Sequence, residues 1–236
     1  MMHPELLHPT QPPARARTTV PSEAEAPARA GRVVSLPADW IHDGGLRAFR
    51  ADAGYLGRSI AALKLYLTLV VNQGAGGDPA PILLSYGRIA AVSGLSDPLI
   101  CDGKKALLDR GLVITDGDRP GGTIAYRLTG LRPSAAAAFL VHGTQPGAPI
   151  AALHGLTCRK ALHLAALKTY LLLCACGRDP DGVASLDVDA ASDLTRTSHV
   201  RMIAALDALQ QLGLAEALGT PSRLAEHRRI RLLPLR

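Results

Sequence analysis

Two nearly identical stretches of nine residues lie 104 positions apart in this chain of 236 residues. The first reads AALKLYLTL at 61–69 and the second AALKTYLLL at 165–173, with seven of the nine letters unchanged. Each is apolar at most positions, as in a helix that is buried on most sides. Half of the chain is long enough for a domain with its own core. The repeat therefore predicts two copies of one fold.

The similarity continues beyond these stretches at an offset of 102 residues, which places a two-residue deletion in the loop that follows. At this offset the pairs are Leu84 with Leu186, Ser96 with Ser198, Ile100 with Met202, and Leu112 with Leu214. The pairs hold mostly apolar residues at helical and strand positions, so the whole unit is duplicated.

Local signals give the order of elements in each copy. In the first copy a helix begins near Ile60 and ends at the Gly/Pro-rich stretch 73–81. Ser85 and Ser96 are candidate N-caps of two further helices, and Pro98 is tolerated in the first turn of the second one. That helix ends before Gly111, and two short strands, 112–115 and 123–128, then form a hairpin.

We therefore expect a mainly α protein with small β-hairpin wings, arranged as two tandem winged helix-turn-helix domains. Aromatic residues make up only 3% of the chain, which also favours helices. The predicted boundaries are a disordered tail 1–35, a first domain 36–131, a connector 132–150 and a second domain 151–236. Trp40, Ile41, Leu46 and Phe49 are expected to close one end of the first domain's core.

A set of spaced residues carries a resemblance to known proteins. Gly94-Leu95-Ser96, Ile100, Leu107 and Gly111-Leu112-Val113-Ile114 resemble the helix-turn-helix core of bacterial winged-helix proteins; the second copy has Arg196-Thr197-Ser198, Met202, Leu209 and Gly213-Leu214. A chain of two winged helices resembles the replication initiators of plasmids and mobile elements. It also resembles two-winged-helix subunits of chromosome-organising complexes, which bind protein and not DNA.

The charge suits a polyanionic partner, because 26 Lys and Arg stand against 20 Asp and Glu, with a pI near 9.4. The start of the second recognition helix is expected to meet base edges, through Thr197, Ser198, His199 and Arg201. The second wing is expected to meet the DNA backbone, through Arg223, Arg228, Arg229 and Arg231, with Arg229 and Arg231 on its outer face.

The first copy carries a thinner set of candidate DNA contacts, namely Lys104 and Lys105 on the helix and Arg119 and Arg127 on the wing. Asp97 and Asp102 oppose them, and glycine at 103 lowers the helix propensity. We expect double-stranded DNA as the partner of a replication initiator or transcription regulator. The alternative is a protein-interaction scaffold in which the winged helices dock partner proteins.

The run Leu162–Cys176 is apolar nearly all round, so one face packs in its own domain and the other needs a cover. A domain–domain contact, a homodimer contact or a connector folded over the helix would supply it. The run is too short to span a bilayer, and no signal-peptide segment is found. We expect a cytoplasmic, nucleoid-associated protein.

No catalytic motif is present: the sequence has no GxxxxGK[ST], GxSxG or HExxH. The chain is therefore not expected to be an enzyme or to need a cofactor. His154, Cys158 and His163, taken with Cys174 or Cys176, match no strong zinc spacing, so no metal site is predicted.

Overall fold

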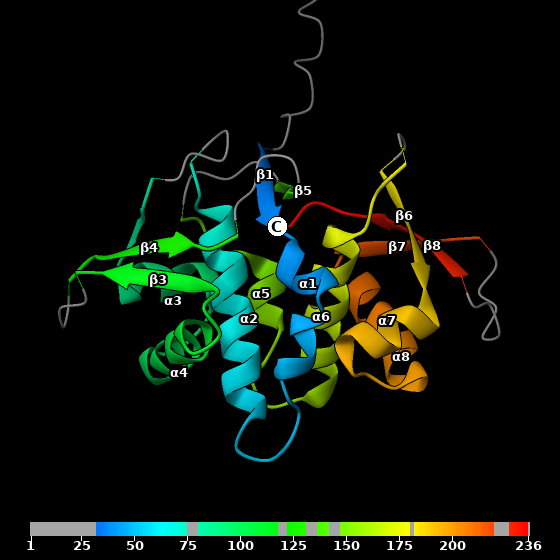
Figure 1. Cartoon of the computed structure of the whole chain (residues 1–236), viewed down its shortest axis with the longest axis horizontal. Coiled ribbons are helices and arrows are strands. Elements are labelled where there is room, and N and C mark those ends of the chain that lie inside the picture. The colour runs from blue at the N-terminus through cyan, green and yellow to red at the C-terminus, as the bar shows by residue number, and fades with distance from the viewer. Residues whose placement is uncertain are drawn as a thin grey trace, which may run out of the picture.

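The computed structural model describes residues 32–74, 80–117, 122–130, 136–141, 147–179, 182–219 and 227–235. Most of the predicted tail, Arg119, Arg223 and part of the predicted connector lie outside the described residues. Two long helices, α2 (Leu56–Val71) and α6 (Ala161–Ala175), lie side by side in the middle of the molecule (Figure 1). They contain the two repeated stretches.

Each central helix begins a helix-plus-wing unit with the same order of elements. In the first unit α2 is followed by β2 (Ile82–Leu84), α3 (Tyr86–Ser93), α4 (Asp97–Leu108), β3 (Val113–Asp116) and β4 (Ile124–Leu128). In the second unit α6 is followed by β6 (Val183–Asp187), α7 (Val188–Thr195), α8 (His199–Gln211), β7 (Ala215–Leu218) and β8 (His227–Leu232).

The two units also share their sheet topology. Each hairpin is joined by the strand that precedes the paired helices, which gives antiparallel orders β2-β4-β3 and β6-β8-β7. The predicted helices and hairpins are present in both halves. The third strand of each sheet was not predicted, because β2 is only three residues long and carries no readable alternation.

Local chemistry explains where the short helices begin and end. The Ser85 hydroxyl accepts a hydrogen bond from the Arg88 N–H at 3.3 Å and caps α3, as predicted. Ser96 occupies the N-cap of α4 without a side-chain hydrogen bond. Gly94 ends α3 in the left-handed region at φ 69°. The equivalent residue after α7 is Arg196, at φ 51°.

A separate two-stranded sheet joins the two halves. In it β1 (Arg32–Pro37) pairs antiparallel with β5 (Ala136–Val141). The strand β1 covers the end of the predicted tail (32–35) and the first two residues of the predicted first domain, and β5 lies within the predicted connector. Residues 32–35 are therefore a strand and not a disordered segment, and neither strand was predicted. The two strands lie about 100 residues apart in sequence, so no local signal shows that they pair. An isolated two-stranded pair is also marginally stable in water, and this pair depends on the packing around it.

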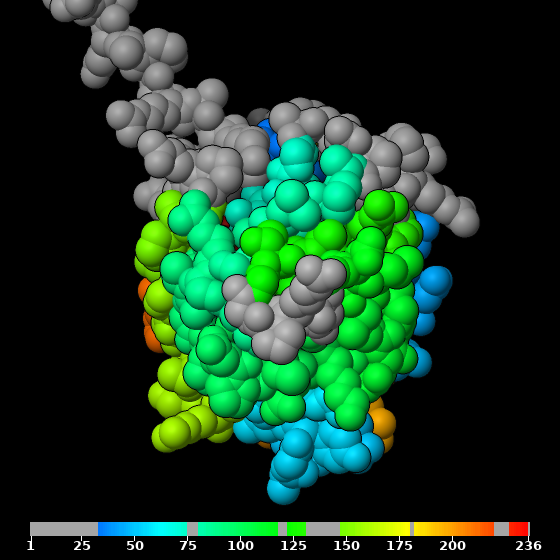
Figure 2. Space-filling model, turned by 90° about the vertical axis from the view of Figure 1, so that its left-hand side faces the viewer, coloured from blue at the N-terminus to red at the C-terminus, as the bar shows by residue number. Residues whose placement is uncertain are grey.

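Each of these strands opens an arm that packs on the other half. The first arm is β1 with α1 (Asp39–His42) and η1 (Gly45–Ala48), and it contacts α6 and α7. The second arm is β5 with α5 (Ala151–Gly155), and it contacts α3. In Figure 2 the region that includes α5, in yellow-green, borders the green face formed by the first unit.

The two arms make equivalent contacts. Arg47 Nε donates a hydrogen bond to the Asp193 carbonyl at 2.7 Å, and His154 Nε2 lies 3.0 Å from the Ala91 carbonyl. The two carbonyls occupy the same place in the repeat, at an offset of 102 residues. The halves are therefore related by a pseudo-two-fold arrangement in which they exchange arms.

The first arm contacts both halves. Trp40 Nε1 donates to the Tyr66 hydroxyl of α2 at 2.9 Å, while α1 itself packs against α6. Phe49 is fully buried and lies under the Arg110 guanidinium, 4.7 Å from its ring centre. The predicted closing segment therefore seals the junction between the units and not the first core alone.

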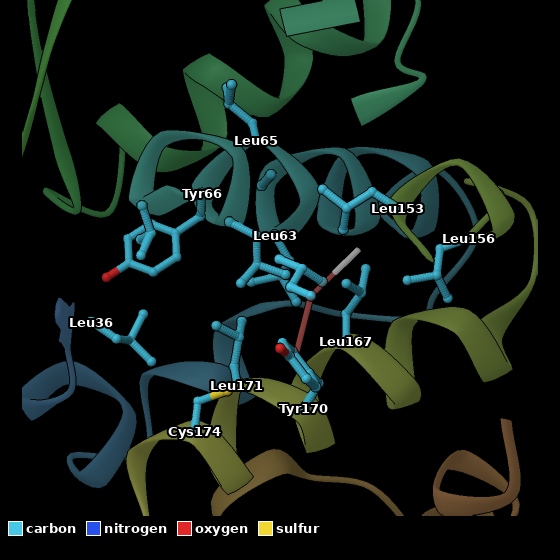
Figure 3. Close-up of a cluster of buried hydrophobic side chains, with 14 of the residues drawn as sticks. Leu36, Leu63, Leu65, Tyr66, Leu153, Leu156, Leu167, Tyr170, Leu171 and Cys174 are labelled. Atoms are coloured by element: carbon cyan, nitrogen blue, oxygen red, sulfur yellow. The ribbon is translucent and has the colours of Figure 1, made fainter. Parts of the chain in front are cut away.

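A single continuous core runs through the molecule between α2 and α6. Figure 3 shows Leu63 and Tyr66 of α2 facing Leu167 and Leu171 of α6. The helix α6 is covered by α8 of its own unit and by α2, α1 and β5. The apolar outer face of α6 is thus buried within the chain by contact with the first unit. The strand β5, which lies in the predicted connector, covers part of it as well.

Candidate nucleic-acid interface

The turn between α7 and α8 positions the first group of predicted contacts. Ser198 is exposed at the N-cap of α8, His199 is half-buried and Arg201 is exposed one turn later. Thr197 is buried, and its hydroxyl points inward to the Thr195 carbonyl at 3.4 Å. Thr197 therefore shapes the turn and presents no side chain to a ligand on the outer surface.

Two features at the start of α8 were not predicted from the sequence. Val200 is 80% exposed beside Arg201. His199 Nδ1 lies 3.3 Å from the Asp189 carboxylate of α7, so a carboxylate lies beside the start of α8. The exposed side chains at the start of α8 are then Ser198, Val200 and Arg201.

The second wing follows the predicted alternation. Ile230 is buried, whereas Arg229 and Arg231 are exposed on the other face of β8. Arg228 lies half-buried on the Ile230 side. Ion pairs hold the two outer arginines: Arg229 with Asp179 at 3.4 Å and Arg231 with Glu216 at 3.2 Å. Exposed pairs of this kind contribute about 0–1 kcal/mol, so a phosphate can replace the carboxylates at small cost.

An acidic residue also caps the helix-turn-helix of this unit. The Asp187 carboxylate accepts hydrogen bonds from the N–H groups of Ala190 and Asp189, both at 3.0 Å. These bonds, and His227 nearby, lower the pKa of Asp187. The carboxylate is therefore ionised as a helix cap at neutral pH, and it adds to the negative charge close to the wing.

The first unit places its predicted contacts differently. Lys104 is buried, and its Nζ lies 5.5 Å from the centre of the Tyr86 ring. Its side chain therefore packs inside the unit. Lys105 is exposed on α4, but so are Asp97 and Asp102. Of these three exposed side chains of α4, two are acidic and one is basic.

Four cationic residues near Arg201 were not among the predicted contacts, namely Arg47, Arg50, Lys168 and Arg196. Arg47 and Arg50 come from the first arm, about 150 residues away in sequence, and nothing local to them indicates this neighbourhood. Arg196 could have been found, because it stands where the repeat has Gly94. Together with Arg201 they line one pocket at the base of α8.

The described part of the chain holds no group of three His, Cys, Asp or Glu side chains placed as metal ligands would be. Cys101, Cys158, Cys174 and Cys176 are all free thiols. Among the same residues, no helix is both long enough and apolar enough to cross a bilayer. No family model, no curated protein and no solved structure matches this chain.

Proposed function

We propose that this chain is a double-stranded DNA-binding protein, either a replication initiator or a transcription regulator, and that its two helix-plus-wing units are winged helices. The order of helix, strand, two helices joined by a tight turn, and hairpin supports this assignment. In such a unit the second of the paired helices enters the major groove. These helices are α4 and α8.

The observation that carries the proposal is the placement of cations on the second unit. Arg201 is exposed at the start of α8, and Arg229 and Arg231 are exposed on the wing of the same unit. An arginine at a recognition helix can read guanine, and an apolar side chain such as Val200 can contact the thymine methyl group. Arginines on the wing suit phosphates. We therefore assign the second unit as the main reader of DNA.

A second candidate function, protein docking, is favoured for the first unit by its sheet. Leu83 and Ile114 are 64% and 58% exposed on the outer face of that sheet. The equivalent positions of the second unit hold Ser185 and Glu216, judged from the strand pairing. An exposed apolar face, in a unit whose α4 begins with acidic residues, suits a protein surface better than a phosphate backbone.

Fluorescence anisotropy with a labelled duplex tests the proposal. The logarithm of the affinity should fall linearly with the logarithm of the salt concentration, because binding releases counterions from the phosphates. On a preferred sequence selected from a random pool, Arg201→Ala should cost about 1–3 kcal/mol, and it should cost much less on random DNA.

Arg127→Ala is the matched control, since it removes an exposed arginine from the first wing. It should leave the ratio of preferred to random affinity unchanged. Absence of binding at low salt would reject the DNA proposal and leave the docking function as the better account.

A further inference from the structure

A pocket of about 220 Å³ lies between the first arm and the second unit. Five cationic side chains line it: Arg47, Arg50, Lys168, Arg196 and Arg201. A single carboxylate, Asp52, is part of the same lining, and it pairs with Arg50. Cationic side chains from three separate parts of the chain therefore converge on one small space, namely η1 with the segment after it, α6, and the α7–α8 turn with the start of α8. Such a cluster is electrostatically costly unless an anion occupies it.

The same place in the first unit is closed. There the repeat has Gly94, and a Cβ added to this glycine would lie only 2.9 Å from Nδ1 of His154 in the second arm. The imidazole ring therefore fills the space beside the turn. In the second unit the turn residue is Arg196, and its side chain lines the open pocket. The two copies therefore differ at this turn: a histidine of the second arm lies against it in the first unit, and the residue at the turn lines a pocket in the second.

Arg196 keeps a backbone conformation that arginine seldom adopts. Its φ is 51°, and it is the one non-glycine residue with positive φ in the described part of the chain. Such a conformation costs free energy of folding, of order 1 kcal/mol, and often marks a functional site. Glycine would remove the strain, as it does in the first unit. The guanidinium at this position therefore points to a role in binding.

Lys168 forms the inner end of the pocket. Its side chain is on α6, the residue is only 4% exposed, and its Nζ donates to the Thr195 carbonyl at 2.8 Å. An ammonium group has three N–H donors, so one carbonyl leaves capacity for an anion. Burial, followed by the charge of Arg196, lowers the pKa of Lys168 to about 8. An anion beside the ammonium would offset both effects.

We propose that this pocket binds the terminal phosphate group of a small phosphorylated ligand, with Lys168 at its inner end and Arg47 and Arg196 at its sides. Guanidinium groups bind phosphate oxygens in a bidentate manner, which suits the chemistry of the lining. The volume is below the ~300–1,000 Å³ that drug-sized ligands occupy, so it fits a phosphate or pyrophosphate head.

A duplex phosphodiester fits this pocket less well than a terminal phosphate does. It carries a sugar on each side and lies along a convex backbone, so it cannot reach a lysine that is 4% exposed. It could meet only the rim, where Arg201 is exposed. The small-ligand proposal does not rest on the proposed DNA-binding function and goes beyond it, although Arg201 lines the pocket as well as the start of α8.

Isothermal titration calorimetry of the full chain tests the proposal without any DNA. Inorganic phosphate and pyrophosphate are titrated separately at constant ionic strength, with chloride as the reference anion. The wild type should bind one anion saturably. Arg196→Gly should weaken binding at least tenfold without lowering the melting temperature, because glycine suits the positive φ. Lys168→Met should weaken it as well.

Arg127→Ala is the charge-matched control and should keep the wild-type affinity. Three results would overturn the proposal. One is the absence of saturable binding in the wild type. Another is an equal loss in the Arg196 and Arg127 variants, which means an adventitious ion only. The third is Arg196→Gly weakening duplex DNA while phosphate fails to bind, which assigns the pocket to a DNA phosphodiester.

Discussion

Gly103 occupies the point of closest approach between α4 and α2. A Cβ at this position would lie 2.9 Å from the carbonyl carbon of Ala61 and 3.0 Å from its oxygen. Both of those atoms belong to helical backbone and cannot move independently. The glycine lowers the intrinsic helix propensity of α4, but it permits the tight packing of the two helices.

Alanine in place of a helical glycine usually raises stability, but at position 103 we expect it to lower stability. We expect Gly103→Ala to lower the free energy of unfolding by about 1–3 kcal/mol, because overpacking outweighs helix propensity. Gly87→Ala in α3 is the matched control. A Cβ at Gly87 meets no atom within 4 Å, so that variant should be unchanged or more stable by about 0.5–1 kcal/mol. Chemical denaturation measures both, and equal effects would contradict the packing argument.

Lys168 should make the stability of the protein depend on pH. Its pKa in the folded chain is about 8, below the value of 10.5 for an exposed lysine. Between these values the unfolded chain binds more protons, so the free energy of unfolding should rise with pH from about 8 to 10.5. Denaturation at pH 7 and pH 9.5 should differ by about 2 kcal/mol from this residue alone.

Lys168→Met isolates this contribution, since methionine keeps most of the side-chain volume and cannot titrate. The variant should lose the rise in stability that Lys168 causes between the two pH values, while other groups titrate as before. A wild type and variant with parallel pH profiles would show that Lys168 is not desolvated in solution.

At the scale of elements, the second wing combines exposed arginines with acidic neighbours. The Asp179 and Glu216 carboxylates hold Arg229 and Arg231 in the unbound protein. If the wing meets phosphates, the double change of both arginines to Ala should weaken preferred and random DNA alike. The slope of log affinity against log salt should fall in magnitude by about two.

A second double variant should change the DNA affinity in the opposite direction, and it serves as the control for that experiment. Asp179→Asn with Glu216→Gln should strengthen DNA binding, because two negative charges are removed and both arginines remain. If neither double variant alters the affinity, the wing does not lie against the DNA. Binding would then rest on α8 alone.

At the scale of the whole molecule, the two units share one core and exchange arms. The arm contacts made by Arg47 and His154 tie each half to the other, and α2 packs along α6. The units lie on opposite sides of this helix pair in Figure 1. Neither unit can lose its fold without exposing apolar surface of its partner.

The protein should therefore unfold in one cooperative transition, with equal calorimetric and van't Hoff enthalpies. Leu171→Ala at the contact between the central helices should destabilise by about 2–5 kcal/mol. Hydrogen exchange should show the loss in both units to the same extent, although the change lies in the second. Two separate melting transitions would contradict this view of a shared core.

Much of the architecture was predictable because its signals are local. The repeat, the apolar helices, the Ser85 cap and the alternation around Ile230 each depend on neighbours within a few residues. Such signals survive in a single sequence, since helix capping and strand alternation act over short distances. The exposed face of Arg229 and Arg231 was predicted in the same way and is confirmed.

Only the tertiary structure decided which distant segments meet. The pairing of β1 with β5, the exchange of arms, the inward turn of Thr197 and the burial of Lys104 all depend on contacts between segments far apart in sequence or on the packing around them. The convergence of Arg47 with Arg196 is of the same kind. The sequence by itself determined two copies of one set of elements, because periodicity and caps are properties of short segments. The shared core and the cationic pocket follow from how those copies pack, since burial and charge proximity depend on every segment that comes into contact.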